Sequence, residues 1–178
     1  MDKNYFETNE ENDFEKLMAF NEATGIFDEI GKTSHKYHTD ATATTTNKLG
    51  ETRYWNIELK DRNLNLLEDG RISGATEKGT FYDNTIFIEN HKAASMFFDM
   101  INGLTPLYIN FLSDGHILIF NLSNLKKRPQ KTGTMNIRSK GYQKFEVAKR
   151  EGLYISDAAI YDKNYKLIKK AGEEFEKQ

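Results

Sequence analysis

The chain has 178 residues, a length that favours one domain with its own apolar core, and its formal net charge at pH 7 is −2. It contains no cysteine, which excludes disulfides, thiolate metal sites and cysteine nucleophiles. No apolar stretch approaches the roughly 20 residues of a membrane span, and the acidic N-terminus does not resemble a signal peptide. We therefore expect a cytoplasmic protein that contacts no membrane, with one domain over residues 1–178.

The charges are unevenly distributed along the chain. Residues 1–31 carry nine acidic and two basic side chains, a net charge of −7, whereas residues 126–150 carry nine basic and one acidic, a net charge of +8. A basic block of this size is typical of a surface that follows a polyanion, and also of a solvated face. Its members that we expect to bind nucleic acid are Lys127, Arg128, Lys131, Arg138, Lys140 and Lys144.

In chain order, the first predicted element is an amphipathic helix over residues 10–23, where Phe14, Leu17 and Met18 recur at helical spacing. An extended segment over residues 35–42 and a strand over residues 53–60 follow. The turn signal at residues 47–50 predicts that these two segments form a hairpin. Residues 61–84 contain three glycines and many polar side chains, which predicts a long loop.

The second half of the chain begins with a short apolar run over residues 85–89. Asn90 is then the expected N-cap of a helix over residues 91–102, which Gly103 ends. Segments 107–112 and 116–122 flank Asp114-Gly115 and give the strongest hairpin signal in the chain. Residues 153–161 predict a strand or buried segment, and residues 164–177 predict a charged terminal helix.

The predicted hairpin of residues 35–60 carries residues suited to one kind of chemistry. Glu58 and Lys60 lie two apart, so a strand places them on one face, while Leu59 between them points to the core. Asp40 lies on the preceding extended segment. Two carboxylates can hold Mg²⁺ while water stays on the ion, and a nearby lysine can orient an attacking water. Phosphodiester hydrolysis uses this combination, because cation and ammonium offset the charge of the transition state.

The order of predicted elements, with Asp40 and the motif Ile57-Glu58-Leu59-Lys60, resembles the PD-(D/E)XK nuclease superfamily. The resemblance covers residues 10–125, leaving a basic C-terminal extension over residues 126–178. It implies an α/β (α+β) fold of the restriction-endonuclease-like type, with a mixed β-sheet flanked by helices. The hairpin segment 107–125 also resembles a strand pair of small phage and bacterial proteins of this type, and a phage protein would act in the host cytoplasm. Thr39 stands where the motif has its proline.

The resemblance also implies roles for individual residues. Asp40 and Glu58 would hold Mg²⁺ or Mn²⁺, and Lys60 would position or activate the water. The family often adds a glutamate from the first helix, for which Glu15 is the first choice and Glu11 the second.

These expectations predict a metal-dependent endodeoxyribonuclease that is selective for structure or only weakly specific for sequence. Arg62 and Lys92 are further candidates for contact with phosphate, and such contacts carry little sequence information. DNA is the expected substrate, with RNA and branched DNA as alternatives. Cutting both strands of a duplex would require a homodimer.

Two plainer interpretations stay open. Glu58 and Lys60 could form a solvent-facing pair, which stabilises a strand little, with Asp40 as a surface residue. Alternatively, the same fold could carry vestigial carboxylates and serve as a non-catalytic module that binds nucleic acid or a protein.

Overall fold

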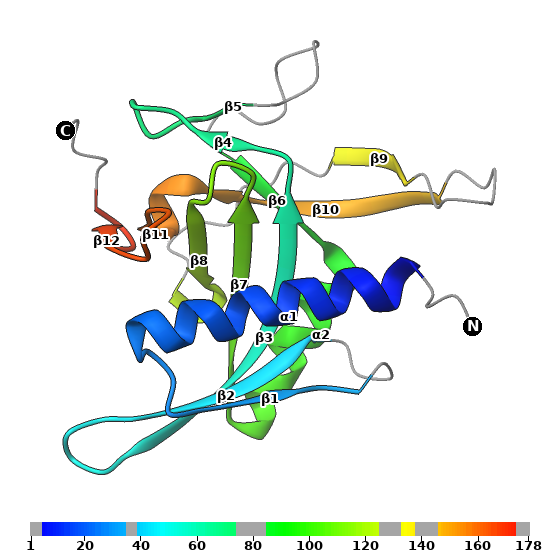
Figure 1. Cartoon of the computed structure of the whole chain (residues 1–178). Helices are drawn as coiled ribbons and strands as arrows, with labels where there is room; N and C mark the ends of the chain where they lie inside the picture. Colours follow the sequence, from blue (N-terminus) through cyan, green and yellow to red (C-terminus); the bar gives the residue numbers. More distant parts are fainter. Residues whose placement is uncertain (1–4, 35–38, 74–84, 125–132, 138–145, 174–178) are drawn as a thin grey trace.

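The computed structural model describes residues 5–34, 39–73, 85–124, 133–137 and 146–173. Its largest element is a seven-stranded sheet in the order β1-β2-β3-β7-β8-β11-β12 (Figure 1). β3 and β7 run parallel, whereas the other neighbours in this sheet are antiparallel. The seven strands are β1 (Glu29–Lys32), β2 (Ala41–Thr46), β3 (Thr52–Arg62), β7 (Leu104–Leu112), β8 (Ile117–Asn121), β11 (Ala159–Tyr161) and β12 (Leu167–Lys169).

Two helices, α1 (Tyr5–Thr24) and α2 (Asn90–Asp99), pack on opposite faces of this sheet. Successive residues of β7 show the two faces. Tyr108 belongs to the core cluster that contains Met96 of α2, whereas Ile109 belongs to the cluster that contains Leu17 and Phe20 of α1. This alternation is what a strand buried on both faces requires. The predicted mixed sheet flanked by helices is thus confirmed.

Both predicted hairpins are present, but the first strand of the first hairpin lies further along the chain than the predicted segment 35–42. It is β2, which begins at Ala41, so Asp40 precedes it, and residues 35–38 lie outside the described segments.

Each turn is held by its acidic or amide residue. In the β2–β3 turn, Asn47 Oδ1 accepts hydrogen bonds from the backbone N–H groups of Leu49 (2.9 Å) and Glu51 (3.0 Å). In the β7–β8 turn, Asp114 Oδ1 accepts from the N–H of His116 (3.1 Å), and Gly115 has a φ of 89°. These side-chain bonds add to the backbone hydrogen bonds of each turn, which is why the sequence signal was strong.

A second, three-stranded antiparallel sheet has the order β6-β10-β9. Its strands are β6 (Thr85–Glu89), β10 (Glu146–Tyr154) and β9 (Gly133–Ile137). The predicted apolar run of residues 85–89 is therefore a strand, and Ile86 and Ile88 belong to the core cluster beneath α2.

The predicted long loop of residues 61–84 begins differently, because β3 continues to Arg62 and a small ribbon follows. That ribbon consists of β4 (Asn65–Leu66) and β5 (Ile72–Ser73), while residues 74–84 lie outside the described segments.

The prediction of a terminal helix over residues 164–177 was wrong for the described residues up to 173. Asp162 Oδ1 accepts hydrogen bonds from the N–H groups of Asn164 and Lys166, both at 2.9 Å, and Tyr165 has a φ of 61°. This turn leads into β12, which pairs with β11. The charged side chains of the segment suggested a helix, but the local side-chain bonds of Asp162 favour a turn.

Two details of the helices also differ from expectation. Asn90 is the first residue of α2, and Glu89 occupies the N-cap position without a side-chain capping bond. The helix ends at Asp99, and the 3₁₀ helix η1 (Met100–Asn102) fills the interval before Gly103, whose φ is 82°. Within the described part of the chain, neither α1 nor α2 has the length and apolar character needed to cross a membrane.

Lys169 at the end of β12 is a buried lysine, with 5% of its surface exposed. Its ammonium donates to the carbonyl oxygens of Ser156 (2.9 Å), Ala158 (2.8 Å) and Lys170 (3.2 Å). Replacing it by methionine should lower the free energy of unfolding by about 1.5–3 kcal/mol, because three carbonyls lose a charged donor. Urea unfolding measures this effect. Lys166→Met, at an exposed position of the same turn, should change stability little; an equal loss in both variants would contradict the explanation.

Candidate active site

Glu58 lies near the centre of β3, and only 1% of its surface is exposed. Strand alternation places its neighbours Ile57 and Leu59 in the core cluster beneath α1. Glu58 itself points to the opposite face, where its carboxylate meets Lys92 in the first turn of α2. Lys60, two residues further along, is exposed. The interpretation of Glu58 as a solvent-facing residue is therefore wrong.

Asp40 directly precedes β2 and is attached to β3 by two hydrogen bonds. Its backbone N–H donates to the carbonyl oxygen of Ile57 (2.9 Å), and its Oδ2 accepts from the N–H of Leu59 (2.7 Å). Because Leu59 follows Glu58, the Asp40 carboxylate lies beside Glu58 at the end of the β2–β3 ladder, which begins at Ala41. The fold thus brings Asp40, Glu58 and Lys60 to one end of the hairpin.

The pKa of Glu58 is raised from 4.5 to about 7. Burial is the main cause, since it disfavours the charged carboxylate, and the charge of Asp40 adds to it. The cations of Lys92 and Lys60 oppose this shift. One oxygen of Glu58, Oε1, pairs with the Lys92 ammonium, while Oε2 has no hydrogen-bond partner among the described residues. A buried carboxylate oxygen without a donor is costly, and a bound ion or an ordered water would satisfy it.

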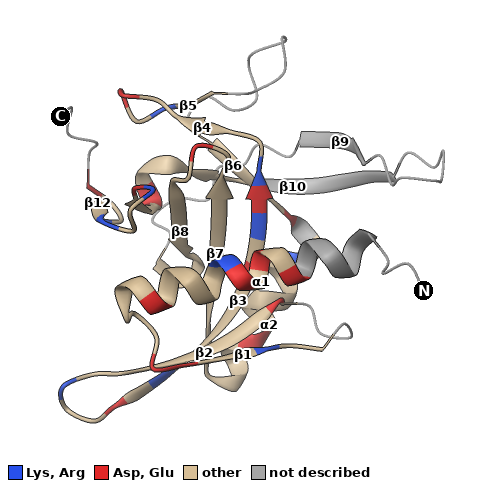
Figure 2. Cartoon of the chain, in the orientation of Figure 1, with Lys and Arg blue, Asp and Glu red and all other residues tan. Residues whose placement is uncertain are grey.

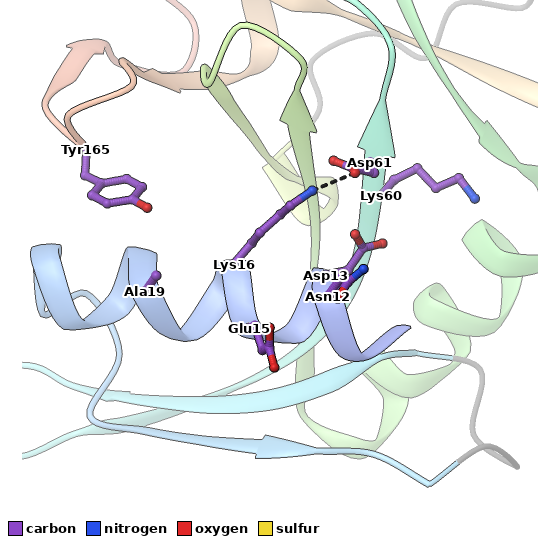
Figure 3. Close-up of a pocket in the computed structure, with 8 residues that line it drawn as sticks. All are labelled: Asn12, Asp13, Glu15, Lys16, Ala19, Lys60, Asp61 and Tyr165. Atoms are coloured by element: carbon purple, nitrogen blue, oxygen red, sulfur yellow. Dashed lines mark ion pairs between the residues drawn. The ribbon is translucent and has the colours of Figure 1, made fainter. Parts of the chain in front are cut away.

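A cleft of about 660 Å³ opens between α1 and the end of β3 (Figure 3). In Figure 2 the charged segments of α1 lie beside those at the end of β3. One contact between them is the ion pair between Lys16 Nζ and Asp61 Oδ2, at 2.6 Å. The cleft is lined by Asn12, Asp13, Glu15, Lys16, Ala19, Lys60, Asp61 and Tyr165.

Asp13 on α1 is electrostatically linked to Asp40, Lys60 and Asp61. Its pKa is raised from 3.8 to about 6, first by burial and then by the charges of Asp61 and Asp40, while Lys16 and Lys60 lower it. Asp40 and Lys60 therefore act on both Asp13 and Glu58. The candidate site therefore comprises Asp40, Glu58 and Lys60 from the hairpin region, with Asp13 from α1 linked to them through Asp40 and Lys60.

The two glutamates expected from the first helix lie differently. Glu15 is exposed and lines the outer part of the cleft, and Figure 3 shows its carboxylate pointing away from Lys60 and Asp61. Glu11 is half-buried, one turn earlier on α1. A role for either one at the site stays a prediction. Asp13 was not among the residues predicted from the sequence.

Arg62, at the end of β3, is engaged within the protein. Its Nε donates to Asn110 Oδ1 (3.0 Å), and its Nη2 donates to the carbonyl oxygen of Phe87 (2.5 Å) and to the hydroxyl of Tyr108. These bonds connect β3 with β7 and β6. Contact of Arg62 with phosphate stays a prediction, but the guanidinium already has three internal acceptors.

The remaining predicted nucleic-acid contacts fall into two groups. Lys92 is part of the site through its ion pair with Glu58. The six residues from the basic block lie outside the described segments; these are Lys127, Arg128, Lys131, Arg138, Lys140 and Lys144.

The donor set of this site fits a hard divalent cation. Asp40 and Glu58 both carry carboxylates at this end of the hairpin, where the charge of Asp40 acts on Glu58, and Glu58 Oε2 lacks a donor within the described structure. Mg²⁺ is commonly held by one or two carboxylates while it keeps several waters, so two protein ligands suffice. No group of three His, Cys, Asp or Glu side chains in the described segments has the geometry of a preformed metal site.

Comparison with known proteins finds similarity at the level of structure. No protein-family model matches the sequence, and no curated protein matches it. A solved structure of Hjc from Archaeoglobus fulgidus, a Holliday junction resolvase from an archaeal hyperthermophile, is similar with a TM-score of 0.40 and 13% sequence identity. The match covers 80% of this chain and 95% of that chain. At this level it does not establish a shared function.

The raised pKa values of Asp13 and Glu58 predict how stability depends on pH when no divalent cation is present. The folded protein binds more protons than the unfolded chain between pH 4 and 7, so the free energy of unfolding should fall as the pH rises through this interval. Thermal unfolding in EDTA at about pH 5 and about pH 8 measures the effect. Asp13→Asn removes one of the two groups and should reduce the fall; an undiminished fall would contradict the contribution of Asp13.

Proposed function

We propose that the protein is a metal-dependent endonuclease that hydrolyses phosphodiester bonds in DNA. The observation that carries the proposal is the buried Glu58, whose Oε2 lacks a donor among the described residues while Asp40 and Lys60 lie beside it. If Glu58 served only in a structural ion pair, Lys92 would be a sufficient partner and the nearby carboxylate of Asp40 would have no use. A second carboxylate beside Glu58 raises the cost of the apo site, and a bound cation would offset that cost.

Each residue of the candidate site has a proposed role in hydrolysis. Asp40 and Glu58 would bind the cation, which on binding supplies Lewis-acid stabilisation of the charge that develops on the phosphate. Asp13 lines the cleft, where its carboxylate would add to the set from α1 and orient water. Lys60 is exposed at the cleft, where its ammonium can hold the attacking water by a hydrogen bond.

The order of elements supports the same proposal. α1, the meander β1-β2-β3, α2 and the parallel strand β7 follow one another in the order that the resemblance to PD-(D/E)XK nucleases implies. Asp40 directly precedes β2 and the Glu58-Leu59-Lys60 motif lies within β3, which is close to the arrangement that the resemblance implies. The sequence resemblance and the arrangement of the side chains thus agree at the same residues.

DNA is the proposed substrate because the chain carries a basic block over residues 126–150. Contacts with phosphate give affinity but little sequence preference, which favours cutting selected by DNA structure, including branched DNA. A single site cuts one strand, so cutting both strands of a duplex would require a homodimer. RNA is the alternative substrate with the same backbone chemistry.

The experiment that tests the proposal is a cutting assay with supercoiled plasmid, linear duplex, branched DNA and RNA of matched length. With Mg²⁺ or Mn²⁺ we expect nicking, which EDTA stops and which is lost in Glu58→Gln and Lys60→Ala. Nicking that persists in both folded variants would overturn the assignment of the chemistry to Glu58 and Lys60. Absence of cutting on every substrate, with DNA binding retained, would favour the alternative below.

The alternative is a non-catalytic module that binds nucleic acid. One observation favours it: Lys92 neutralises Glu58 within the protein, so the fold is complete without a cation. The double variant Lys140→Glu/Lys144→Glu distinguishes binding through the basic block from a merely solvated face. If the block binds DNA, the variant should bind more weakly and with a smaller salt dependence.

Asp13 and Glu15 provide a matched pair on one helix. Asp13→Asn should reduce the cutting rate about 10- to 100-fold, because it removes a carboxylate that supports the cation site. Glu15→Gln makes the same chemical change at an exposed position and should leave the rate near native. Rates on supercoiled DNA at several Mg²⁺ concentrations measure both. The reverse ranking would assign the α1 ligand to Glu15.

A further inference from the structure

Lys92 reaches from the first turn of α2 to the buried carboxylate of Glu58. Its Nζ donates to Glu58 Oε1. The side chain of Lys92 is 32% exposed, against 2% for that of Glu58, so the lysine extends inward from the surface. Glu58 thus has one oxygen bound to an internal cation and one oxygen, Oε2, without a partner in the described residues.

The same carboxylates that would attract a divalent cation also attract the ammonium of Lys92. Besides Glu58, the carboxylates of Asp40 and Glu89 attract it, and together these attractions raise its pKa although burial lowers it. Two cations at one buried carboxylate repel each other strongly, because the interior screens charge poorly. A divalent cation and the Lys92 ammonium therefore compete for Glu58.

The Lys92 ammonium can be displaced from Glu58 by a movement of its own side chain. A lysine has a flexible four-carbon stem, so Lys92 can leave Glu58 and place its ammonium in water at the surface with small changes of torsion angles. Glu58 is fixed within β3 between Ile57 and Leu59 and cannot follow. Movement of Lys92 is therefore the simplest way to make Glu58 Oε1 available to a divalent cation.

We propose that Lys92 is an internal counter-ion of Glu58 that leaves when a divalent cation binds, which frees its ammonium to contact the phosphate of the substrate. This inference rests on the proposed function, because it concerns the same cation site. Lys92 keeps the buried carboxylate paired in the cation-free protein. After displacement, its positive charge is available on the substrate side of the site, so binding of the cation and binding of DNA become coupled.

Calorimetric titration with Ca²⁺ and with Mn²⁺, without DNA, tests the competition. We compare the native full chain with Lys92→Met, which removes the charge, with Lys92→Arg, which keeps it, and with Lys48→Met, an exposed control on the β2–β3 turn. Lys92→Met should bind the cations about 5- to 150-fold more tightly than the native protein, the usual range for coupled binding. Lys92→Arg and Lys48→Met should stay near native. In Ca²⁺, Lys92→Met should also bind DNA more weakly.

The possible failures are distinguishable. Equal or weaker cation binding by a folded Lys92→Met variant overturns the counter-ion role alone, whereas no cation binding by either native protein or variant overturns the proposed function as well. Native protein provides a second test that does not depend on the folding of Lys92→Met. Reductive methylation of Lys92, followed by mass spectrometry, should become faster when Ca²⁺ is added; an unchanged rate contradicts displacement.

Discussion

Glu58→Gln should reduce cation-dependent cutting of DNA by at least about 100-fold, the usual cost of removing a group that stabilises transition-state charge. Glutamine keeps the size of the side chain but lacks the negative charge that holds a cation. Of the two carboxylates proposed to bind the cation, Asp40 would then be the one left. The initial rate of nicking of supercoiled DNA at saturating Mg²⁺ measures the loss, and calorimetry with Mn²⁺ should show weaker binding.

The matched control is Glu51→Gln, the same change at an exposed position in the turn of the same hairpin. Glu51 accepts a hydrogen bond from Asn47 Nδ2 (2.7 Å), which glutamine can keep through its carbonyl oxygen. Because Glu58→Gln leaves Lys92 without its counter-charge, circular dichroism must show that the variant is folded. A folded variant that cuts at the native rate would place the chemistry elsewhere in the protein.

Lys60→Ala should lower the cutting rate by about 10²–10⁴-fold, the usual contribution of a positioned proton-transfer group. Cation binding should be retained, because the carboxylates are unchanged and Lys60 opposes a cation by charge. The side chain is exposed, so its removal opens no cavity in the core. The combination of intact cation binding and lost chemistry would separate the role of Lys60 from that of Glu58.

Lys48→Ala, at an exposed position of the β2–β3 turn, is the control for loss of one positive charge. If both variants lost activity equally, and added salt reduced the native activity to the same extent, general electrostatic attraction of DNA would explain the effect of Lys60. A variant of Lys60 that cuts normally would require another group to hold the water. Lys16 lines the same cleft and would be the next residue to replace.

The hairpins and the strand pair that carry the site were predictable because their signals are local. Asn47 and Asp114 determine turns through bonds to backbone groups a few residues away, and the apolar alternation of residues 55–59 is visible in the sequence. Burial of Glu58 is different. It depends on α2 covering that face of β3, a contact between distant segments that no local pattern encodes.

The contribution of α1 could have been predicted more closely. Asp13, Leu17 and Phe20 have the spacing of one helix face, and Leu17 and Phe20 are both fully buried. Asp13 therefore lies at the N-terminal end of the buried stripe, whereas Glu15 lies on the other side of the helix. A carboxylate at the margin of an apolar stripe is a better candidate than one on the solvated face.

β1 escaped prediction for a physical reason. Its four residues, Glu29–Lys32, are exposed except for half-buried Ile30, and they include a glycine. It pairs at the sheet edge with β2 alone. Such a strand is stabilised by backbone hydrogen bonds to its neighbour, so its sequence shows no apolar alternation from which it could be predicted.

The rings that cover Phe20 come from the far end of the sequence. Tyr161 and Tyr165 lie edge-on against Phe20, with ring centroids 5.0 and 5.9 Å away. During synthesis, α1 leaves the ribosome long before these tyrosines exist, so its apolar stripe cannot be fully covered until the chain has grown past them. The helix that carries Asp13 should settle against the sheet late in translation, and a nascent chain that stops before Tyr161 should lack a working site.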